Sequence, residues 1–457
     1  MSSIKTLGSI NPATGQTIAT YPVNTTEETE AIISLAEKAF SAWSQTSFAH
    51  RATLMQKAAD MLLARKAELG LLMTREMGKV LKDSIAEVEK CANCCRYYAE
   101  NAEAFLADEP IKTEASDSFV AYQPLGPVLA IMPWNFPFWQ VFRFAAPALM
   151  AGNVGILKHA SNVQGCGYAI QDIFREAGFP EGCFSNVAIP GSEMEALIAH
   201  RAIKAVTLTG SENAGIQVAA TAGKNLKKTV LELGGSDAFI VLEDVDIPAV
   251  ASLAAKARMI NAGQSCIAAK RFIVVNSIAE SFAKEMAAAM DALVMGDPEN
   301  PATNYGPQAR QDLAAELEKQ VNACLQGGAV ARTKAVPKAD GAWFPATLLD
   351  NVQPGTPGWD EELFGPVASL IRVKDAEEAI TVANSSRFGL GGSIWTADSE
   401  RGKLLARSME AGCIFVNEIV KSDPRVPFGG IKKSGFGREL SHHGIKEFVN
   451  VKTVWVK

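Results

Sequence analysis

Runs of apolar residues change their spacing along this chain, and the spacing predicts which element each run forms. Three segments near the N-terminus are rich in alanine and glutamate and lack internal proline, which predicts helices over 26–45, 49–70 and 83–107. Two shorter segments, 118–123 and 128–132, are apolar and β-branched and predict strands. The first quarter of the chain is therefore mainly helical, and nothing in its helices suggests chemistry.

From residue 154 onward, predicted strands and helices alternate. The strands cover 154–158, 185–189, 205–208 and 229–233, and the helices 163–177, 194–200 and 214–222. Regular alternation of this kind predicts a parallel sheet with helices on both faces, which binds ligands at the carboxyl ends of its strands. The fold class is α/β with a Rossmann-like dinucleotide-binding domain.

A second alternation follows and predicts a second α/β domain, with a cleft between the two. Its strands cover 237–242, 271–276, 366–373, 393–395 and 412–417, and its helices 249–259, 279–293, 308–324 and 376–384. The tail, 447–457, has the pattern of an extended strand.

Size and charge narrow the function classes. A chain of 457 residues with 48% hydrophobic content is too long for one core and has enough apolar residues to fill two. Its net charge of −6 gives no basic face for nucleic acid and no polybasic membrane anchor, so small molecules are the expected partners. The segment 1–6 lacks the pattern of a signal peptide, and the longest apolar run, 144–157, is interrupted by proline and glycine, so we expect a cytoplasmic protein.

The eight cysteines do not form a disulfide framework, and reduced thiols fit a cytosolic setting. Cys91, Cys94 and Cys95 resemble half of a zinc site. No second Cys-x-x-Cys or histidine pair completes it, and their spacing places them on one face of a helix. We therefore expect no metal.

One further cysteine, Cys266, ends the stretch Asn-Ala-Gly-Gln-Ser-Cys over 261–266, a glycine-bearing loop between a predicted helix and a predicted strand. A thiol at such a junction can lie at the lip of a cleft, where backbone N–H groups stabilise a thiolate and an oxyanion. An isolated cysteine is more often a small buried hydrophobe. Two other stretches argue against that alternative here: Pro-Trp-Asn-Phe-Pro at 133–137 and Leu-Glu-Leu-Gly-Gly at 231–235.

Six motifs in order resemble the aldehyde dehydrogenase superfamily: 133–137, Leu-Thr-Gly-Ser at 208–211, 231–235, 261–266, Glu-Glu-Leu-Phe-Gly-Pro at 361–366 and Pro-Phe-Gly-Gly at 427–430. The resemblance runs from Ile10-Asn11-Pro12 to the last predicted strand. The common G-x-G-x-x-G fingerprint is absent, and the wider spacing at 210–215 is the one this family uses.

The resemblance implies three parts. A dinucleotide-binding domain would comprise 1–111 and 127–234, and a catalytic domain 235–430. A small β oligomerisation arm, 112–126 and 431–457, would join copies into a homodimer or homotetramer.

The resemblance also implies catalytic roles. Cys266 would attack the aldehyde, giving a thiohemiacetal and then a thioester, and Asn135 would complete an oxyanion hole with the Cys266 backbone N–H. Glu232 would activate the water that hydrolyses the thioester, with a pKa raised by its apolar surroundings. The alternative for Glu232 is a structural glutamate paired with a lysine.

Cofactor contacts carry over from the family in the same way. Lys158 would bond the adenosine ribose, Glu362 would hold the nicotinamide ribose, and Phe364 would pack beside the ring; a solvated acidic pair is the alternative for Glu361 and Glu362. The full set comprises Met132, Pro133, Trp134, Asn135, Lys158, Ser161, Gly191, Thr209, Gly210, Ser211, Glu232, Leu233, Gly234, Glu362 and Phe364.

One departure bears on cofactor choice. Many NAD-preferring relatives have a glutamate where this chain has Ser161, and its absence removes the repulsion of a 2′-phosphate. We therefore expect both NAD and NADP to be used.

The substrate is predicted from fewer residues. Arg143 stands where succinate semialdehyde dehydrogenases carry an arginine for the substrate carboxylate, although pairing with an internal carboxylate is the alternative. A second arginine of those enzymes is replaced by Ile260, and the neighbouring cysteine of their redox switch by Ala268. The other candidate substrate contacts are Trp139, Lys421, Ser422 and Arg425.

The leading prediction is thus NAD(P)-dependent oxidation of succinate semialdehyde to succinate. A broad-range aliphatic or aromatic aldehyde dehydrogenase is the alternative, with Arg143 only structural. A coenzyme A dependent relative generally lacks the glutamate at Glu232. A catalytically silent structural or binding protein would be expected to lack Cys266, Glu232 or Asn135, and a cysteine hydrolase would need a Cys-His signature that the five histidines do not form.

Overall fold

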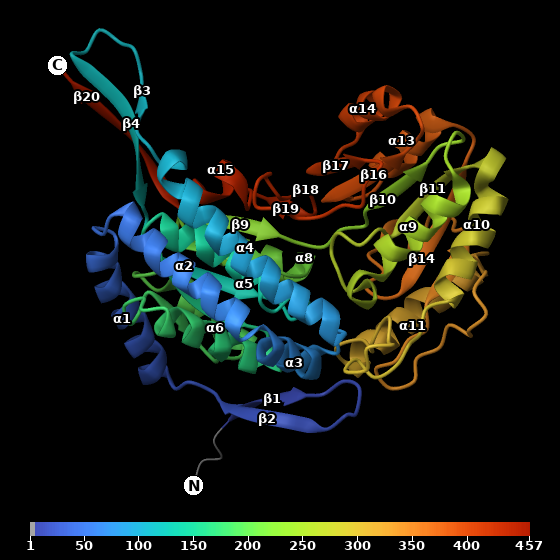
Figure 1. Cartoon of the computed structure of the whole chain (residues 1–457), viewed down its shortest axis with the longest axis horizontal. Coiled ribbons are helices and arrows are strands. Elements are labelled where there is room, and N and C mark those ends of the chain that lie inside the picture. The colour runs from blue at the N-terminus through green and yellow to red at the C-terminus, as the bar shows by residue number, and fades with distance from the viewer. Residues whose placement is uncertain (1–4) are drawn as a thin grey trace.

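The structure is a computed structural model that describes residues 5–457. A six-stranded sheet forms the core of the first half, with its strands in the order β19, β9, β8, β5, β6, β7 (Figure 1). The bounds are Gly435–Phe436, Lys228–Glu232, Ala205–Thr209, Pro127–Met132, Val154–His159 and Phe184–Asn186. All neighbours are parallel except β19 with β9. The predicted parallel sheet is confirmed, because its central strands are continuous apolar runs buried on both faces.

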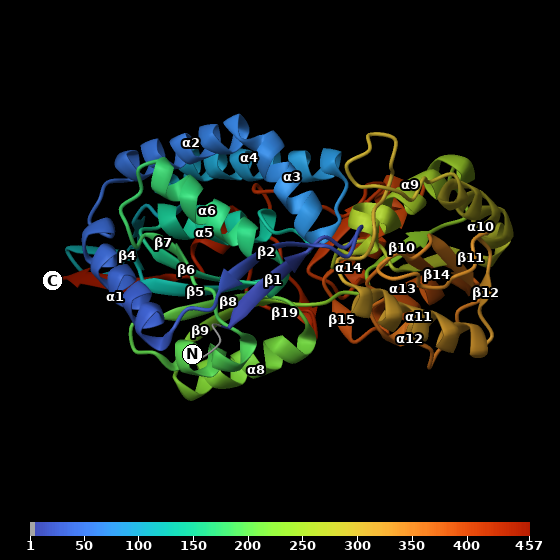
Figure 2. The ribbon, with the colours of Figure 1, turned by 90° about the horizontal axis from the view of Figure 1, so that it is seen from below.

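Helices cover both faces of this sheet. Figure 2 shows α2, α4 and α6 on one side and α8 on the other. The helices of this half are α1 (Thr26–Trp43), α2 (Phe48–Ala64), α3 (Lys66–Met77), α4 (Leu81–Phe105), α5 (Trp139–Met150), α6 (Gln164–Glu176), α7 (Met194–Ala199), α8 (Glu212–Lys224) and the short α15 (Ser441–Ile445).

The second half is built on a seven-stranded sheet in the order β12, β13, β14, β11, β10, β16, β17. The bounds are Val330–Ala331, Thr347–Asp350, Val367–Val373, Arg271–Val275, Ala238–Val241, Gly391–Trp395 and Cys413–Val416. Its helices are α9 (Ile247–Met259), α10 (Asn276–Asp291), α11 (Gln311–Gln326), α12 (Pro357–Asp360), α13 (Ala376–Asn384) and α14 (Ser399–Ser408). The two sheets form separate lobes (Figure 1).

A three-stranded antiparallel arm extends from the first lobe, where the C-terminus lies (Figure 1). It contains β3 (Glu109–Pro110), β4 (Asp117–Pro124) and β20 (Val449–Val456). The predicted arm began too early, at residue 431, because β18 (Ile431–Lys432) pairs with β15 (Phe388–Gly389) and β19 completes the first sheet. Residues 431–448 therefore belong to the body of the protein.

One other prediction needs correction, and two elements were not predicted. The helix predicted over 49–70 is two helices, separated at Arg65, which bonds Glu68 and Glu176. No proline or glycine marks this break. The hairpin of β1 (Thr6–Ile10) and β2 (Thr17–Pro22) was not predicted. Neither was α5, which contains Pro147 and whose twelve residues are all buried.

No helix within residues 5–457 is both long and apolar enough to cross a membrane. The expectation that segment 1–6 is not a signal peptide concerns residues 1–4 in part, and these lie outside the described residues.

Candidate active site

A cavity of about 420 Å³ lies where the strands of the first sheet end and the second lobe begins. Its lining includes Cys266 from the second lobe and, from the first, Asn135 after β5, Thr209 at the end of β8 and Gly234 after β9. The thiol predicted as nucleophile therefore faces the mouth of the sheet and is not enclosed in the core. This is the arrangement expected at the carboxyl ends of parallel strands.

The loop that carries Cys266 has a strained backbone. Asn261, Ala262 and Gly263 are consecutively left-handed, with φ of 52°, 53° and 76°. A Cβ on Gly263 would lie 2.0 Å from the carbonyl oxygen of Gly365, so only glycine fits there. Such strain persists only where surrounding contacts hold it.

Two buried cations provide those contacts. The Lys270 ammonium donates to the carbonyl oxygens of Ser265 (2.7 Å) and Cys266 (2.6 Å), and it lies 3.1 Å from the Glu362 carboxylate. The Arg258 guanidinium donates to the Gly263 carbonyl at 2.5 Å. Lys270 thus joins the nucleophile loop to the residue predicted to hold the nicotinamide ribose.

Burial raises the pKa of the Cys266 thiol to about 12, and the positive charges of Lys270 and Arg143 only partly oppose this. The role of backbone N–H groups in stabilising a thiolate here stays a prediction. The low-dielectric surroundings disfavour the anion, and the ammonium of Lys270 bonds carbonyl oxygens. The thiol is protonated at neutral pH and needs a base.

The Asn135 side chain is held in one orientation. Its Oδ1 accepts from Gln140 Nε2 at 3.1 Å, and its Nδ2 donates to the Gln264 carbonyl at 3.1 Å. One Nδ2 hydrogen remains, and no acceptor within residues 5–457 takes the Cys266 backbone N–H. These are the two donors that the oxyanion-hole prediction requires.

Glu232 ends β9 and is fully buried, with neither carboxylate oxygen bonded to any described residue. Burial raises its pKa well above the usual value, and the neighbouring Glu439 raises it further, against Arg143 and Arg438. The expected rise in pKa is confirmed, and no lysine pairs with Glu232 among residues 5–457. Three residues later, Gly235 packs against the Cys266 carbonyl, since a Cβ there would lie 2.8 Å from it.

The cavity suits a dinucleotide. The Glu362 carboxylate packs directly against the backbone of Gly234. A side chain at position 234 would displace it, because a Cβ there would lie 2.4 Å from Glu362 Oε2. Ser211 caps α8 by accepting the Ala214 N–H, and Ser211 also lines the cavity, so the positive end of this helix dipole lies beside the cavity. Trp134 and Phe364 meet edge to face at 5.9 Å and form an apolar wall.

The predicted cofactor contacts divide into two groups. The cavity lining contains Pro133, Trp134, Asn135, Thr209, Gly210, Ser211, Leu233, Gly234, Glu362 and Phe364. Lys158, Ser161 and Gly191 lie outside the lining, at or after the ends of the adjacent β6 and β7. Met132 and Glu232 also do not line the cavity and are buried at the ends of β5 and β9. Burial lowers the pKa of Lys158, which has no acidic partner within residues 5–457.

Arg143 has an internal partner in the structure, as the alternative to substrate binding required, and its contact with a substrate carboxylate stays a prediction. Arg143 forms a buried ion pair with Glu439, donates to Thr209 Oγ1 at 3.3 Å and stacks on Phe428. The predicted oligomerisation arm included Glu439, so the sequence did not predict that Glu439 lies beside Arg143.

The other predicted substrate contacts lie in two places. Trp139 Nε1 donates to Ser422 Oγ at 2.9 Å, which joins the start of α5 to the loop after β17. Lys421 and Arg425 line a separate hollow of about 430 Å³ with Cys413 and Phe428. Lys421 pairs with Glu418, and Arg425 with Asp423.

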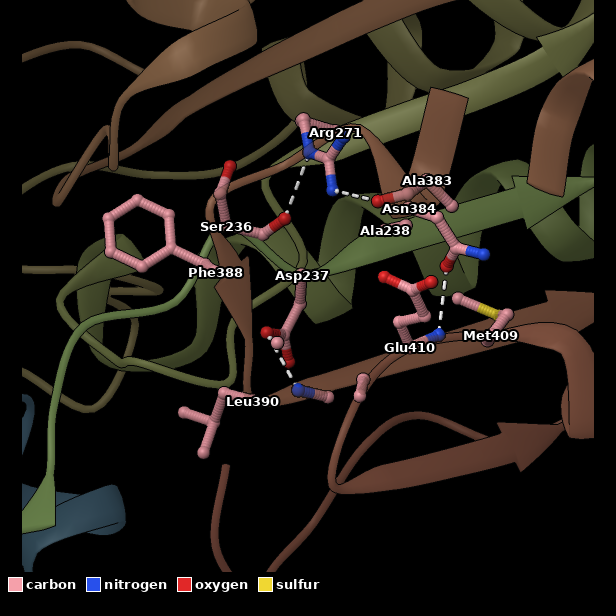
Figure 3. Close-up of a pocket in the computed structure, with 13 residues that line it drawn as sticks. Ser236, Asp237, Ala238, Arg271, Ala383, Asn384, Phe388, Leu390, Met409 and Glu410 are labelled. Atoms are coloured by element: carbon pink, nitrogen blue, oxygen red, sulfur yellow. Dashed lines mark hydrogen bonds between the residues drawn. The ribbon is translucent and has the colours of Figure 1, made fainter. Parts of the chain in front are cut away.

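Behind the Cys266 loop, the start of β11 is anchored by a buried polar group. Arg271 donates to the carbonyls of Ser236, Val382 and Ala383, each at 2.9 Å. Figure 3 shows the bonds to Ser236 and Ala383 and the bond that Asp237 accepts from the Gly391 N–H. The backbone N–H of Lys270 donates to the Asp237 carbonyl at 3.0 Å. This group fixes the strand from which Lys270 reaches the nucleophile loop.

Sequence reasoning missed several supporting residues. Gln140, Arg258 and Lys270 were given no role, although Lys270 follows the nucleophile by only four positions. A charged residue inside an apolar run is the signal that could have found Lys270, since such a charge needs polar partners.

Comparison with known proteins agrees with this geometry. The profile of the Aldehyde dehydrogenase family matches residues 1–454. The chain belongs to the aldehyde dehydrogenase family. The six motifs that suggested the resemblance all lie within the matched range.

Individual aldehyde dehydrogenases are similar over the full length. A probable NADP-dependent succinate-semialdehyde dehydrogenase of Synechocystis sp. is 53% identical over 452 residues, which cover 98% of this chain and 99% of that protein. The succinic semialdehyde dehydrogenase of Streptococcus pyogenes, solved with NADP+, is 34% identical, with a TM-score of 0.95 over 98% of this chain and 99% of that one. An NAD-dependent aldehyde dehydrogenase of Sinorhizobium meliloti is 32% identical, with a TM-score of 0.95, and the match covers 99% of this chain and 91% of that one.

Proposed function

We propose that this aldehyde dehydrogenase oxidises succinate semialdehyde to succinate with NADP or NAD. The observation that carries the proposal is the shared cavity, which brings the Cys266 thiol, the Asn135 amide and the predicted nicotinamide-ribose ligand Glu362 to one place. The substrate follows from the similarity to succinate-semialdehyde dehydrogenases over almost the entire chain.

The reaction begins at the thiol. Glu232, whose carboxylate is unbonded and whose pKa is raised by burial, takes the Cys266 proton, and the sulfur then adds to the aldehyde carbon. The new oxyanion receives hydrogen bonds from Asn135 Nδ2 and the Cys266 backbone N–H. A bound dinucleotide would supply the acceptor for the hydride that leaves this carbon.

The second half of the reaction is hydrolysis. Oxidation leaves a thioester on Cys266. Glu232 first releases the thiol proton to solvent and then removes a proton from the water that attacks the thioester. The acid departs and the thiol recovers its proton. Aldehyde, water and oxidised dinucleotide are thus converted to acid, reduced dinucleotide and one proton.

Residues at the ends of β5, β6 and β8 would hold the cofactor. Lys158 and Ser161 would bond the adenosine ribose or its 2′-phosphate, and the α8 N-terminus would face the pyrophosphate. Because Ser161 carries no negative charge, both NAD and NADP are expected to serve.

We also propose that the arm pairs with another copy, giving a homodimer or homotetramer. The strand β20 lies at the edge of its sheet and exposes Val451, Trp455 and Val456. Such an edge favours pairing with another strand. Light scattering after size-exclusion chromatography measures the assembly, and a monomer at micromolar concentration would exclude this proposal. We place the enzyme in the cytoplasm, in keeping with its eight free cysteines.

The test of the activity is spectrophotometric. Purified protein, NADP or NAD, and succinate semialdehyde should give an increase in absorbance of the reduced dinucleotide, with a higher kcat/KM than butanal gives. A broad-range enzyme would show equal or greater efficiency with butanal. Absence of any dinucleotide reduction with both aldehydes would exclude dehydrogenase activity altogether.

A further inference from the structure

A lysine and a glutamate form an ion pair in the interior of the first lobe. Lys79 lies between α3 and α4, Glu87 lies in the second turn of α4, and both side chains are buried. The Lys79 ammonium bonds Oε2 of the Glu87 carboxylate. Taking two charges out of water costs free energy that their attraction seldom returns in full, so stability alone does not explain this pair.

The other oxygen of Glu87 caps a helix that adjoins the active site. Oε1 accepts the backbone N–H groups of Phe138 and Trp139, each at 2.9 Å. These are the N-cap and the first residue of α5, and the Phe138 side chain provides no capping bond. The first N–H groups of a helix have no partner within it, and a negative charge suits the positive end of its dipole. Glu87 therefore fixes the start of α5 from a different helix.

The motif at 133–137, which carries Asn135, is held from the same side. The Lys79 ammonium lies 3.8 Å from the centroid of the Phe136 ring. The buried His159 accepts the Ala160 N–H at Nδ1, so its Nε2 carries the hydrogen and donates to the Pro137 carbonyl at 2.9 Å. Neither Lys79, Glu87 nor His159 lines the cavity. They therefore support the motif without reaching a bound substrate.

The start of α5 in turn sets the orientation of the predicted oxyanion donor. Gln140, in the first turn of α5, donates from Nε2 to Asn135 Oδ1 at 3.1 Å. One Nδ2 hydrogen of Asn135 is held by the Gln264 carbonyl, so the remaining one has a fixed direction. An oxyanion donor must lie about 2.7–3.1 Å from the oxygen it stabilises. A shift in the first turn of α5 would move Gln140, and with it that hydrogen.

We propose that Glu87 is a positioning residue of the reaction. By capping α5 it holds Gln140, and through Gln140 it holds the Asn135 amide where the oxyanion forms. Lys79 balances the charge of the buried carboxylate. The inference rests on the proposed function, in which Asn135 stabilises the oxyanion, and it adds a residue that touches neither substrate nor cofactor.

The test uses two double variants that differ only in whether an acceptor remains at position 87. Lys79→Met with Glu87→Leu removes both charges and the acceptor. Lys79→Met with Glu87→Gln removes both charges but keeps a carbonyl oxygen for the two N–H groups. Neither variant leaves a buried charge unpaired, so both proteins are expected to fold.

Turnover should depend on the acceptor. We expect kcat to fall about 10- to 100-fold with Glu87→Leu, because a displacement of about 1 Å near the reacting atoms can cost two orders of magnitude. With Glu87→Gln the fall should stay below about threefold, since an amide oxygen still caps α5. The fall should be the same for succinate semialdehyde and butanal, because the oxyanion forms on the aldehyde group that both share.

A double-mutant cycle with Asn135→Ala shows whether Glu87 acts through Asn135. In the Asn135→Ala background, the pair of changes with Glu87→Leu should lower kcat less than about twofold. A general loosening of the lobe would lower kcat by the same factor in both backgrounds. Dinucleotide affinity, measured by fluorescence titration, should stay within about threefold of the wild type, because the helix cap does not hold the cofactor.

A matched control is Glu76→Leu. Glu76 is also buried and caps a helix, because its carboxylate accepts the N–H groups of Gly165 and Cys166 at the start of α6, each at 3.0 Å. None of its hydrogen bonds within residues 5–457 reaches α5 or the motif at 133–137. Any change in kcat from Glu76→Leu should be the same factor with and without Asn135→Ala.

Glu87→Asp gives a second measurement should the variant with Glu87→Leu fail to fold. It keeps both charges but shortens the side chain by one methylene, which withdraws the acceptor from α5. We expect kcat to fall about 3- to 10-fold, and again only while Asn135 is present.

The outcomes separate the two proposals. Suppose that the wild type oxidises the aldehyde and that Asn135→Ala lowers kcat. If the Glu87 variants then keep the wild-type kcat, or lose it by the same factor in both backgrounds, positioning by Glu87 is wrong and the proposed function stands. If Asn135→Ala leaves kcat unchanged, or the wild type reduces no dinucleotide, the proposed chemistry is wrong, and the role of Glu87 with it.

Discussion

Replacement of Lys270 by methionine tests whether one buried ammonium holds the nucleophile loop in place. Methionine keeps most of the side-chain volume but removes the donors to the Ser265 and Cys266 carbonyls and the partner of Glu362. Hydrogen bonds to a charged group contribute about 1.5–3 kcal/mol each, so the two carbonyl bonds amount to about 3–6 kcal/mol. Burying an ammonium costs several kcal/mol, which leaves an expected net loss of about 1–3 kcal/mol.

The effect on catalysis should be larger than the effect on stability. Without Lys270 the left-handed segment 261–263 can relax, and a displacement of about 1 Å at a nucleophile can lower turnover roughly 10²-fold. The substitution should also raise the pKa of Cys266, because Lys270 is the first of the charges that oppose the effect of burial on that thiol. A rise of one unit would lower the thiolate fraction about tenfold.

Two assays check these outcomes. Steady-state kinetics gives kcat, and alkylation of the Cys266 peptide by iodoacetamide at pH 9, followed by mass spectrometry, gives the thiolate fraction. The control is Lys256→Met, an exposed lysine on α9, which should behave as the wild type. If Lys270→Met alkylates at the wild-type rate and keeps kcat within threefold, Lys270 does not position the loop and the reasoning is refuted.

Three further predictions concern the proposed chemistry. Glu232→Gln should slow steady-state turnover by about 10²- to 10⁴-fold. A stopped-flow experiment on the same variant tests for a burst of reduced dinucleotide. Turnover at the wild-type rate would exclude Glu232 as the base. Because burial raises the pKa of Glu232, wild-type hydrolysis should be lost as pH falls through that raised value, and the pH–rate profile of Glu232→Gln should lack this limb. Asn135→Ala should lower kcat roughly 10²- to 10³-fold with little change in dinucleotide affinity by fluorescence titration, and an unchanged kcat would exclude it from the oxyanion hole. Ser161→Glu should raise KM for NADP at least about tenfold and leave KM for NAD within threefold, since a carboxylate repels a 2′-phosphate; equal effects on both would contradict the placement of Ser161.

The amino-acid sequence alone determined the local elements and the identity of the reacting groups. Strands such as β5 and β8 are short apolar runs between turn residues, and their alternation with helices is sufficient to specify a parallel sheet. The motifs around Asn135, Glu232 and Cys266 were found because their residue types and order follow from the chemistry and from a family resemblance.

Only the tertiary structure decided which charges meet. Arg143 and Glu439 are far apart in the chain, and they pair because β19 returns to the first sheet and carries Glu439 back with it. Glu87 and the first N–H groups of α5 are likewise brought together by the packing of α4 against α5. Local periodicity reports which face of an element is apolar, but the partner of a buried charge depends on long-range packing that no local pattern contains.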